Sequence, residues 1–156
     1  MLSSTVRDIM KKNVVSVYPE TSLLEAHRVL QEHRFDGVPV VDGEKHLVGI
    51  LTEYDLIAKG SSLHLPTFQK ILAELDVLRR DRTTFQDEVA QLKKITVADV
   101  MNADPLTFLQ DTTLSEAIAV FRDHHRVNPV PVITKDRIVI GVVSRYDVLK
   151  LLDMLK

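Results

Sequence analysis

The sequence contains no cysteine and no tryptophan among its 156 residues. Without cysteine the chain forms no disulfide bond, no thiolate metal site and no cysteine nucleophile, and this composition fits a cytoplasmic location. Aromatic residues make up only 5% of the chain, which leaves few rings on which the bases of a single-stranded nucleic acid could stack. These absences exclude several classes of site before any motif is considered.

The chain also lacks an excess of charge and a long apolar run. Its 20 Lys and Arg against 22 Asp and Glu give a net charge of -2, which gives no electrostatic reason to expect binding to nucleic acid or to an anionic membrane surface. No stretch approaches the roughly 20 apolar residues of a membrane-spanning helix, and the first residues lack the apolar core of a signal peptide. With 45% hydrophobic and 27% charged residues, we expect a folded cytoplasmic protein of one ordinary or two small domains.

What the sequence does contain is an internal repeat. The hexapeptide TVRDIM at residues 5–10 recurs as TVADVM at 96–101, at an offset of 91 residues. A one-residue insertion near Asn128 changes the offset to 92, at which the Val-Pro-Val segment 38–40 recurs at 130–132. Because order and spacing are kept, we interpret the chain as a duplication. It divides into a first repeat at 1–60, an insert at 61–94 and a second repeat at 95–156.

Each copy is predicted to form a β-α-β-β-α unit, which makes the fold class mixed α/β (α+β). Short apolar runs bounded by turn residues predict strands at 14–17, 38–41 and 47–51, and at 106–109, 130–133 and 138–143. Capping-box patterns at Ser22 and Thr113, each with Glu three residues later, predict the first helix of each copy. The second helices are predicted at 53–59, stopped by Gly60, and from residue 145 to the end of the chain.

A unit of about 60 residues buries too little surface to be stable alone. We therefore expect the copies to pack through their sheets around a pseudo-two-fold axis, which creates clefts suited to a ligand. The insert at 61–94 has apolar residues at spacings of three and four, which predicts one or two amphipathic helices. These helices either pack on their own module or bind a second chain.

The segments that could carry chemistry are two Gly-x-x-Thr/Ser-x-x-Asp motifs, formed by Gly49, Thr52 and Asp55 and by Gly141, Ser144 and Asp147. Spacing alone is explained by helix capping, with the hydroxyl residue as N-cap. In a ligand-binding interpretation, the helix N-terminus suits a phosphate, the hydroxyl donates to a phosphate or sugar oxygen, and the carboxylate accepts from two ribose hydroxyls. Glycine in each motif permits a close approach. Both interpretations remain open at this point.

The Val-Pro-Val segments add to the ligand-binding interpretation. Pro39 and Pro131 have no N–H for a ladder, so their strands should lie at an edge or a bulge, with neighbouring backbone groups free to meet an adenine edge. Val38 and Val130 could then flank the adenine ring.

In this ordered set of motifs, present twice, the chain resembles a cystathionine-β-synthase (CBS) domain pair, also called a Bateman module, over nearly everything outside residues 61–94. The resemblance implies a non-catalytic regulatory module that binds AMP, ADP, ATP or S-adenosylmethionine between the repeats and acts on a partner protein. It further implies that the opening of each repeat completes the cleft of the other. Under it, Thr96 and Met101 serve the Asp55 site, and Thr5 and Met10 serve the Asp147 site.

The resemblance also nominates residues near the phosphate, just before the Val-Pro-Val strands: Arg34, Asp36, His125, Arg126 and Asn128. Many members of the family carry a basic residue before the motif Asp, whereas this chain has Tyr54 and Tyr146. That departure disfavours a triphosphate and leaves AMP as the favoured ligand. Arg145, with His124, His125 and Arg126, makes the second site more cationic, so we expect the Asp147 site to bind more tightly.

Other functions find no support in the pattern. The six histidines show no metal-ligand spacing, and no nucleophile is paired with a base, so neither a metal, a catalytic cofactor nor an enzymatic activity is expected. The resemblance and the Leu-rich last helix point to a homodimer. The competing hypothesis is a protein-interaction module with empty clefts, which acts through the insert at 61–94.

Overall fold

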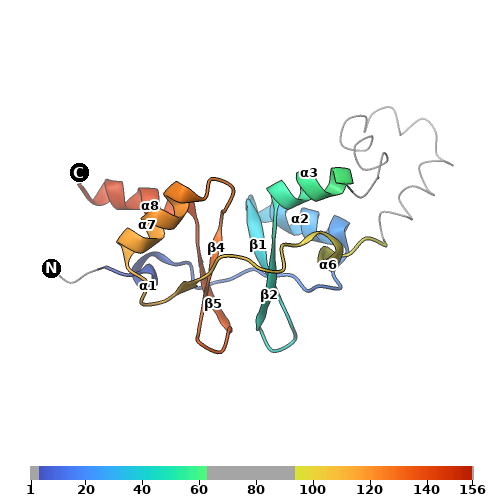
Figure 1. The fold of residues 1–156 in the computed structure, drawn as a ribbon, viewed down its shortest axis with the longest axis horizontal. Helices are drawn as coiled ribbons and strands as arrows, with labels where there is room; N and C mark the ends of the chain where they lie inside the picture. The colour runs from blue at the N-terminus through green and yellow to red at the C-terminus, as the bar shows by residue number, and fades with distance from the viewer. Residues whose placement is uncertain (1–3, 63–93, 156) are drawn as a thin grey trace.

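The structure, a computed structural model, describes residues 4–62 and 94–155. Two similar halves each consist of a small sheet with helices packed on it, and the sheets lie side by side at the centre (Figure 1). The first half contains α2 (Leu23–His33), β1 (Gly37–Val41), β2 (Leu47–Thr52) and α3 (Glu53–Ser62). The second contains β3 (Phe108–Leu109), α7 (Leu114–Asp123), β4 (Val130–Ile133), β5 (Val139–Val143), α8 (Arg145–Leu149) and the 3-10 helix η1 (Lys150–Leu155). The predicted mixed α+β fold class is confirmed.

Two short helices, α1 (Val6–Ile9) and α6 (Val97–Val100), exchange partners between the halves. Although α1 opens the first repeat, the backbone N–H of Val6 donates to the carbonyl of Thr112, and Lys11 and Val142 exchange two backbone hydrogen bonds. In the same way α6 joins the first half, where Asn102 and Ile50 exchange the equivalent pair of bonds. Each half is therefore completed by a segment from the other repeat.

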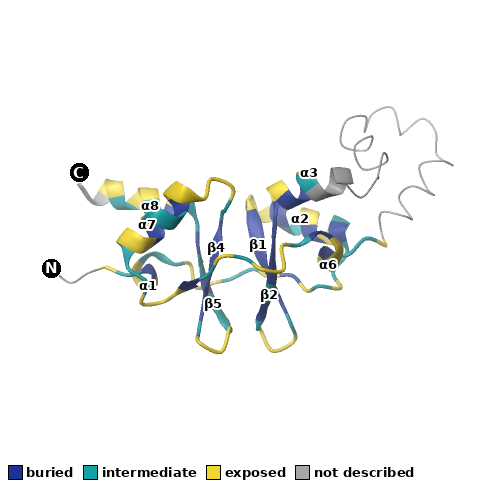
Figure 2. Cartoon of the chain, viewed as in Figure 1, coloured by how far each residue is buried: buried dark blue, intermediate teal, exposed yellow. Residues whose placement is uncertain are grey.

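The exchanged helices contribute to the cores as well as to the backbone pairing. Val97 and Val100 are fully buried in the core of the first half, and Val6 is fully buried in the core of the second. Burial is concentrated on the strands and on one face of each helix (Figure 2). Because burying an aliphatic side chain of this kind contributes about 1.5–3 kcal/mol, the exchange stabilises two units that are each too small to be stable alone.

The turns of the two hairpins also join the sheets. The N–H of Leu47 donates to the carbonyl of Arg137, and the N–H of Val139 donates to the carbonyl of Lys45. The halves thus meet through their sheets, as the repeat predicted.

Several predicted boundaries differ from the structure. Segment 14–17 forms only an isolated bridge between Val17 and Val40, because Pro39 has no N–H with which to extend the ladder. Helix α3 continues through Gly60. A glycine ends a helix when it takes a positive φ, and no glycine in the described residues does so. The last helix changes from α to 3-10 geometry at Lys150, and residues 63–93 of the predicted insert lie outside the described residues.

The sequence predicted that the Pro-containing strands lie at an edge or carry a bulge, and both strands carry a bulge. The register shifts between Val40 and Val41 and between Val132 and Ile133. Strand β4 is not an edge strand, since it lies between β3 and β5. It tolerates Pro131 because β3 pairs only from Val132 onwards and because Val142, opposite Pro131, directs its N–H to Lys11.

Within the residues that the structure describes, no helix has both the length and the apolar character needed to span a membrane.

Candidate functional site

Two cavities lie where the halves meet, and the repeat relates one to the other. The Asp147 cavity, named for its buried carboxylate, has a volume of about 470 Å³ and also contains Ser144 from the second repeat, with Lys11 and Arg34 from the first. The Asp55 cavity has a volume of about 160 Å³. Its motif residues Thr52 and Asp55 come from the first repeat, and Asn102 and Arg126 come from the second.

In both motifs the hydroxyl residue and the Asp form a capping box. Ser144 donates from its N–H (2.8 Å) and its Oγ (2.9 Å) to Oδ2 of Asp147, and Oγ accepts from the N–H of Asp147. Thr52 and Asp55 are bonded in the same way. Asp147 is only 4% exposed and Asp55 only 7%. The capping interpretation is therefore correct for the hydroxyl and for Oδ2, while Oδ1 of each Asp takes no part in the box.

In this geometry the motif hydroxyl and part of the helix N-terminus are engaged within the protein. The hydrogen of the Ser144 hydroxyl is already donated to Asp147, so the hydroxyl has none left for a phosphate oxygen. At the start of α8, the N–H of Arg145 donates to Oδ1 of Asn128 and the N–H of Asp147 donates to Ser144. With these groups engaged, a phosphate in the cavity would gain from a further donor.

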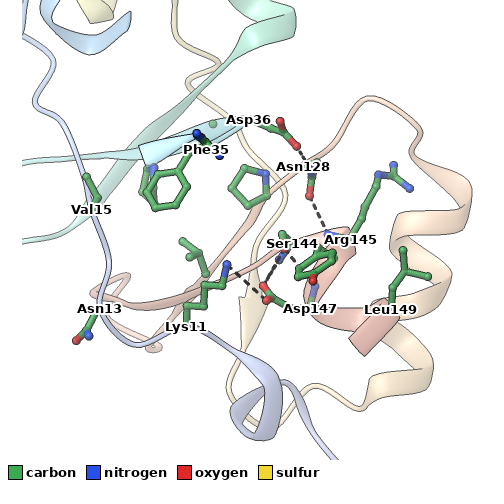
Figure 3. Close-up of a pocket in the computed structure, with 16 residues that line it drawn as sticks. Lys11, Asn13, Val15, Phe35, Asp36, Asn128, Ser144, Arg145, Asp147 and Leu149 are labelled. Carbon is green, nitrogen blue, oxygen red and sulfur yellow. Dashed lines mark hydrogen bonds and ion pairs between the residues drawn. The ribbon is translucent and has the colours of Figure 1, made fainter. Parts of the chain in front are cut away.

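Lys11 supplies such a donor. Its Nζ lies 3.7 Å from Oδ1 of Asp147, and Figure 3 shows the ammonium directed toward that carboxylate. At this distance the two groups attract each other without a hydrogen bond, so both keep hydrogen-bonding capacity for a ligand. The backbone bonds between Lys11 and Val142 fix the position of the lysine, which links the ion pair to the exchange of the opening segments.

Arg145, which was expected to make this site more cationic, uses its guanidinium within the protein. Its guanidinium donates to the carbonyls of Phe121 and His124, both at 2.7 Å, and also lies 5.4 Å from the centre of the Phe121 ring. The side chain thus binds the carbonyl end of α7 and runs away from the Lys11–Asp147 pair (Figure 3). Arg145 lines the Asp147 cavity together with Lys11 and Arg34, but its guanidinium is engaged by these two carbonyls.

Asn128 and Asp36 join the two cavities on the pseudo-two-fold axis. The two residues are equivalent in the repeat, and Nδ2 of Asn128 donates a 2.8 Å hydrogen bond to Oδ2 of Asp36. Both line the Asp147 cavity, and Asn128 also lines the Asp55 cavity. Since this amide is held by Asp36 and by the N–H of Arg145, its place in the structure is that of a link between the repeats.

Two pairs of predicted site residues have a packing role. Val38 and Val130 are fully buried in the two cores, so they cannot flank an adenine ring. A Cβ on Gly49 or Gly141 would lie 2.7 Å from the sulfur of Met101 or Met10. These glycines therefore accommodate a methionine from the exchanged opening segment, where the sequence suggested the close approach of backbone or of a ligand.

The remaining predicted residues divide into those that line a cavity and those that do not. Pro39 lines the Asp147 cavity and Arg126 the Asp55 cavity. Thr5 and Thr96 cap α1 and α6. Neither cavity is lined by the following residues: Thr5, Met10, Val38, Gly49, Thr96, Met101, His125, Val130, Pro131 and Gly141. His125 and Arg126 thus add no charge to the Asp147 cavity, which corrects the reason given for favouring that site.

The sequence interpretation missed Lys11, Asn13, Val15 and Phe35, all of which line the Asp147 cavity. Lys11 directly follows the repeated hexapeptide, and its equivalent in the second repeat is Asn102. This difference between the two repeats, Lys in one and Asn in the other, could have identified Lys11 from the sequence. No group of three or more His, Asp or Glu side chains in the described part of the chain is arranged to hold a metal ion.

Comparison with protein families and sequences places these features among known proteins. A family model described as the CBS domain matches residues 6–61 and 97–153. The chain is 29% identical to Uncharacterized protein MJ1426 of Methanocaldococcus jannaschii, over 94% of this chain and 90% of that protein. It is also 29% identical to CBS domain-containing protein CBSX1, chloroplastic, of Arabidopsis thaliana, with 94% of this chain covered. The match spans 63% of that plant protein.

Solved structures show the same arrangement. The crystal structure of CBSX2 in complex with AMP matches with a TM-score of 0.71 and 25% identity, and the match covers 97% of both chains. The crystal structure of the CBS domain pair of protein MJ0100, in complex with 5-methylthioadenosine and S-adenosyl-L-methionine, matches with a TM-score of 0.66 and 26% identity. That match covers 96% of this chain and 99% of the other.

Proposed function

This chain belongs to the CBS domain family, and we propose that it is a non-catalytic regulatory module that binds an adenosine-containing ligand in the Asp147 cavity. The observation that carries the proposal is the pairing of a buried carboxylate, Asp147, with the ammonium of Lys11 inside a cavity between the repeats. Its volume of about 470 Å³ lies within the range of about 300–1,000 Å³ common for small-molecule sites.

The charges of the cavity fit the two ends of a nucleoside monophosphate. Oδ1 of Asp147 lies outside the capping box and can accept from the ribose hydroxyls. Lys11 and Arg34 line the same cavity and supply cations for one phosphate. Because the capping box occupies the motif hydroxyl, few donors remain for a triphosphate, so we favour AMP. The complexes of CBSX2 with AMP and of MJ0100 with 5-methylthioadenosine and S-adenosyl-L-methionine support an adenosine ligand.

A thermal-shift measurement tests this function. At a hundredfold excess over Kd, a ligand that binds only the folded state raises the free energy of unfolding by about 2.7 kcal/mol, roughly 5–10 °C in Tm for a chain of this size. The ligands compared are AMP, ADP, ATP, NAD, S-adenosylmethionine and 5-methylthioadenosine. We expect the largest shift with AMP, and no shift with any of them would contradict the proposal.

A matched pair of variants tests the site. Asp147→Asn keeps one side-chain oxygen for the capping box and removes the charge that faces the ligand, so it should abolish most of the shift. Asp136→Asn makes the same change at an exposed turn residue of the second hairpin and should leave the shift intact. Equal shifts in the two variants would show that the ligand binds elsewhere.

The regulated protein is, in this proposal, a separate chain that senses whether the cavity is occupied and so responds to the cell's supply of AMP and ATP. We place both in the cytoplasm, which the cysteine-free composition supports.

We also propose that two copies form a homodimer through one helical face. Ile57 on α3 is 70% exposed and Tyr146 on α8 is 64% exposed, and Leu149 and Leu152 nearby are also exposed. Helices α3 and α8 lie on the same side of the two sheets, one in each half (Figure 1), so a second copy packed on this side could cover their exposed apolar side chains.

A further inference from the structure

The same pair of residue types lines both cavities but is arranged differently in each. At an offset of 92 residues, Arg34 corresponds to Arg126 and Tyr146 to Tyr54. In the Asp55 cavity the guanidinium of Arg126 lies 4.7 Å from the centre of the Tyr54 ring, and its Nη1 donates to the Tyr54 hydroxyl. In the Asp147 cavity the ring of Tyr146 faces Nζ of Lys150, at 4.9 Å, and no hydrogen bond or ring contact joins it to Arg34 in the described structure.

The one-residue insertion and a helix α7 that ends one residue earlier than α2 together explain the difference. In the first repeat, Arg34 directly follows the last residue of α2 and is its C-cap, with a left-handed backbone (φ 55°, ψ 45°). In the second repeat α7 ends at Asp123 and His124 is its C-cap. Arg126 therefore lies two residues past the C-cap, in the turn before β4. From there its side chain crosses the interface between the repeats and reaches Tyr54.

The Asp55 cavity, where Arg126 contacts Tyr54, differs from its counterpart in volume and in charge. That cavity has about 160 Å³, against about 470 Å³ for its counterpart, which places it below the usual range of about 300–1,000 Å³ for ligand sites. Of the described residues that line it, Arg126 is the sole Lys or Arg, and it is engaged with Tyr54. In the Asp55 cavity the residue equivalent to Lys11 is Asn102, an uncharged residue whose side chain accepts from the N–H of Asp104.

We propose that the chain binds one adenosine ligand, in the Asp147 cavity, and that Arg126 and Tyr54 act as an internal plug that closes the Asp55 cavity. This inference rests on the function proposed above, which it extends by assigning a stoichiometry and a residue pair that sets it. The pseudo-symmetric cavities thus divide into a ligand site and a site closed by the protein's own side chains.

Isothermal titration calorimetry with AMP, and with 5-methylthioadenosine as a second probe, tests the plug. The unaltered chain should bind one ligand per chain. Arg126→Ala should open the Asp55 cavity and add a second, weaker site, so that two ligands bind per chain. Tyr54→Ala removes the other half of the contact and should do the same. Arg122→Ala is the matched control, because Arg122 pairs with Asp123 on the surface, and it should keep one site.

The outcomes separate the plug from the function. Two sites in the unaltered chain, or a single site retained in both Arg126→Ala and Tyr54→Ala, would overturn the plug and leave the proposed function standing. Weaker binding after Arg126→Ala without a second site would also overturn it, since Arg126 would then contact the ligand. No binding of either probe by any of these proteins would overturn the proposed function, and the plug with it.

Discussion

At the scale of single residues, the candidate site depends on which atoms remain available after local structure has formed. The motif hydroxyls and one oxygen of each motif Asp are used to cap a helix. Oδ1 of Asp147 and the ammonium of Lys11 remain. The ligand-binding potential of the motif therefore resides in its carboxylate, together with a lysine that comes from the other repeat.

Replacing Lys11 tests this assignment. Lys11→Met keeps the apolar part of the side chain and removes the ammonium, so it should weaken AMP roughly ten- to hundredfold, because a hydrogen bond to a charged group is worth about 1.5–3 kcal/mol. 5-Methylthioadenosine carries no phosphate, and its affinity should stay within about twofold. Calorimetric Kd values measure both effects.

Lys12→Met is the control for this variant, since Lys12 is exposed next to Lys11 and does not line the cavity. It should change neither affinity. An equal loss for both ligands in Lys11→Met would show that the lysine supports the structure of the cavity without contacting a phosphate.

At the scale of elements, local capping and exchanged backbone pairing decide where helices begin. Capping boxes open α1, α3, α6, α7 and α8, and the sequence signature of the α7 box identified its start correctly. Helix ends were less predictable. Gly60 lies inside α3, because a glycine that keeps a helical φ weakens a helix without stopping it.

The cap of α7 can be tested by Thr113→Ala. The Thr113 hydroxyl accepts from the N–H of Glu116 at 3.2 Å and donates to its carboxylate at 2.8 Å. Losing an N-cap of this kind should lower the free energy of unfolding by about 1 kcal/mol at pH 7. Denaturant titration measures this loss, and Ser115→Ala, an exposed site on the same helix, should change it little.

The same variant has a signature in pH. Hydrogen bonds from Thr113, first from its side chain and then from its backbone, lower the pKa of the Glu116 carboxyl. A carboxyl whose pKa is lowered by folding stabilises the protein above its unfolded pKa, and this contribution is lost as the pH falls through the folded pKa. In Thr113→Ala the pKa of Glu116, followed by NMR, should move up toward its ordinary value. An unchanged pKa would contradict the capping geometry.

At the scale of the whole molecule, the exchange of α1 and α6 makes the two repeats a single cooperative unit. Each core contains valines from the other repeat, and each cavity is lined from both. The helical face that carries Ile57 and Leu149 remains exposed, which is the basis for the proposed homodimer.

The dimer can be tested by small-angle scattering and by sedimentation. The unaltered chain should have about twice the 17.7 kDa mass of one chain, and Ile57→Glu combined with Leu149→Glu should reduce this to one. Leu109→Glu introduces the same charge at an exposed residue of β3 and should leave the dimer intact. A monodisperse monomer of the unaltered protein would contradict the proposal.

The amino-acid sequence by itself determined the duplication, the fold class and the main strands, because these depend on local apolar patterns, turn residues and caps that recur at a fixed offset. The family resemblance further implied that the opening of each repeat serves the other. Only the tertiary structure decided which atoms face a cavity. The sequence suggested Val38, Gly49 and Arg145 as ligand contacts. In the structure Val38 is buried in the core and the sulfur of a methionine lies against Gly49. The guanidinium of Arg145 donates to two backbone carbonyls. Lys11 and the Arg126–Tyr54 contact become visible only when the chain is folded, because they join residues from different repeats, and local sequence patterns do not encode such distances.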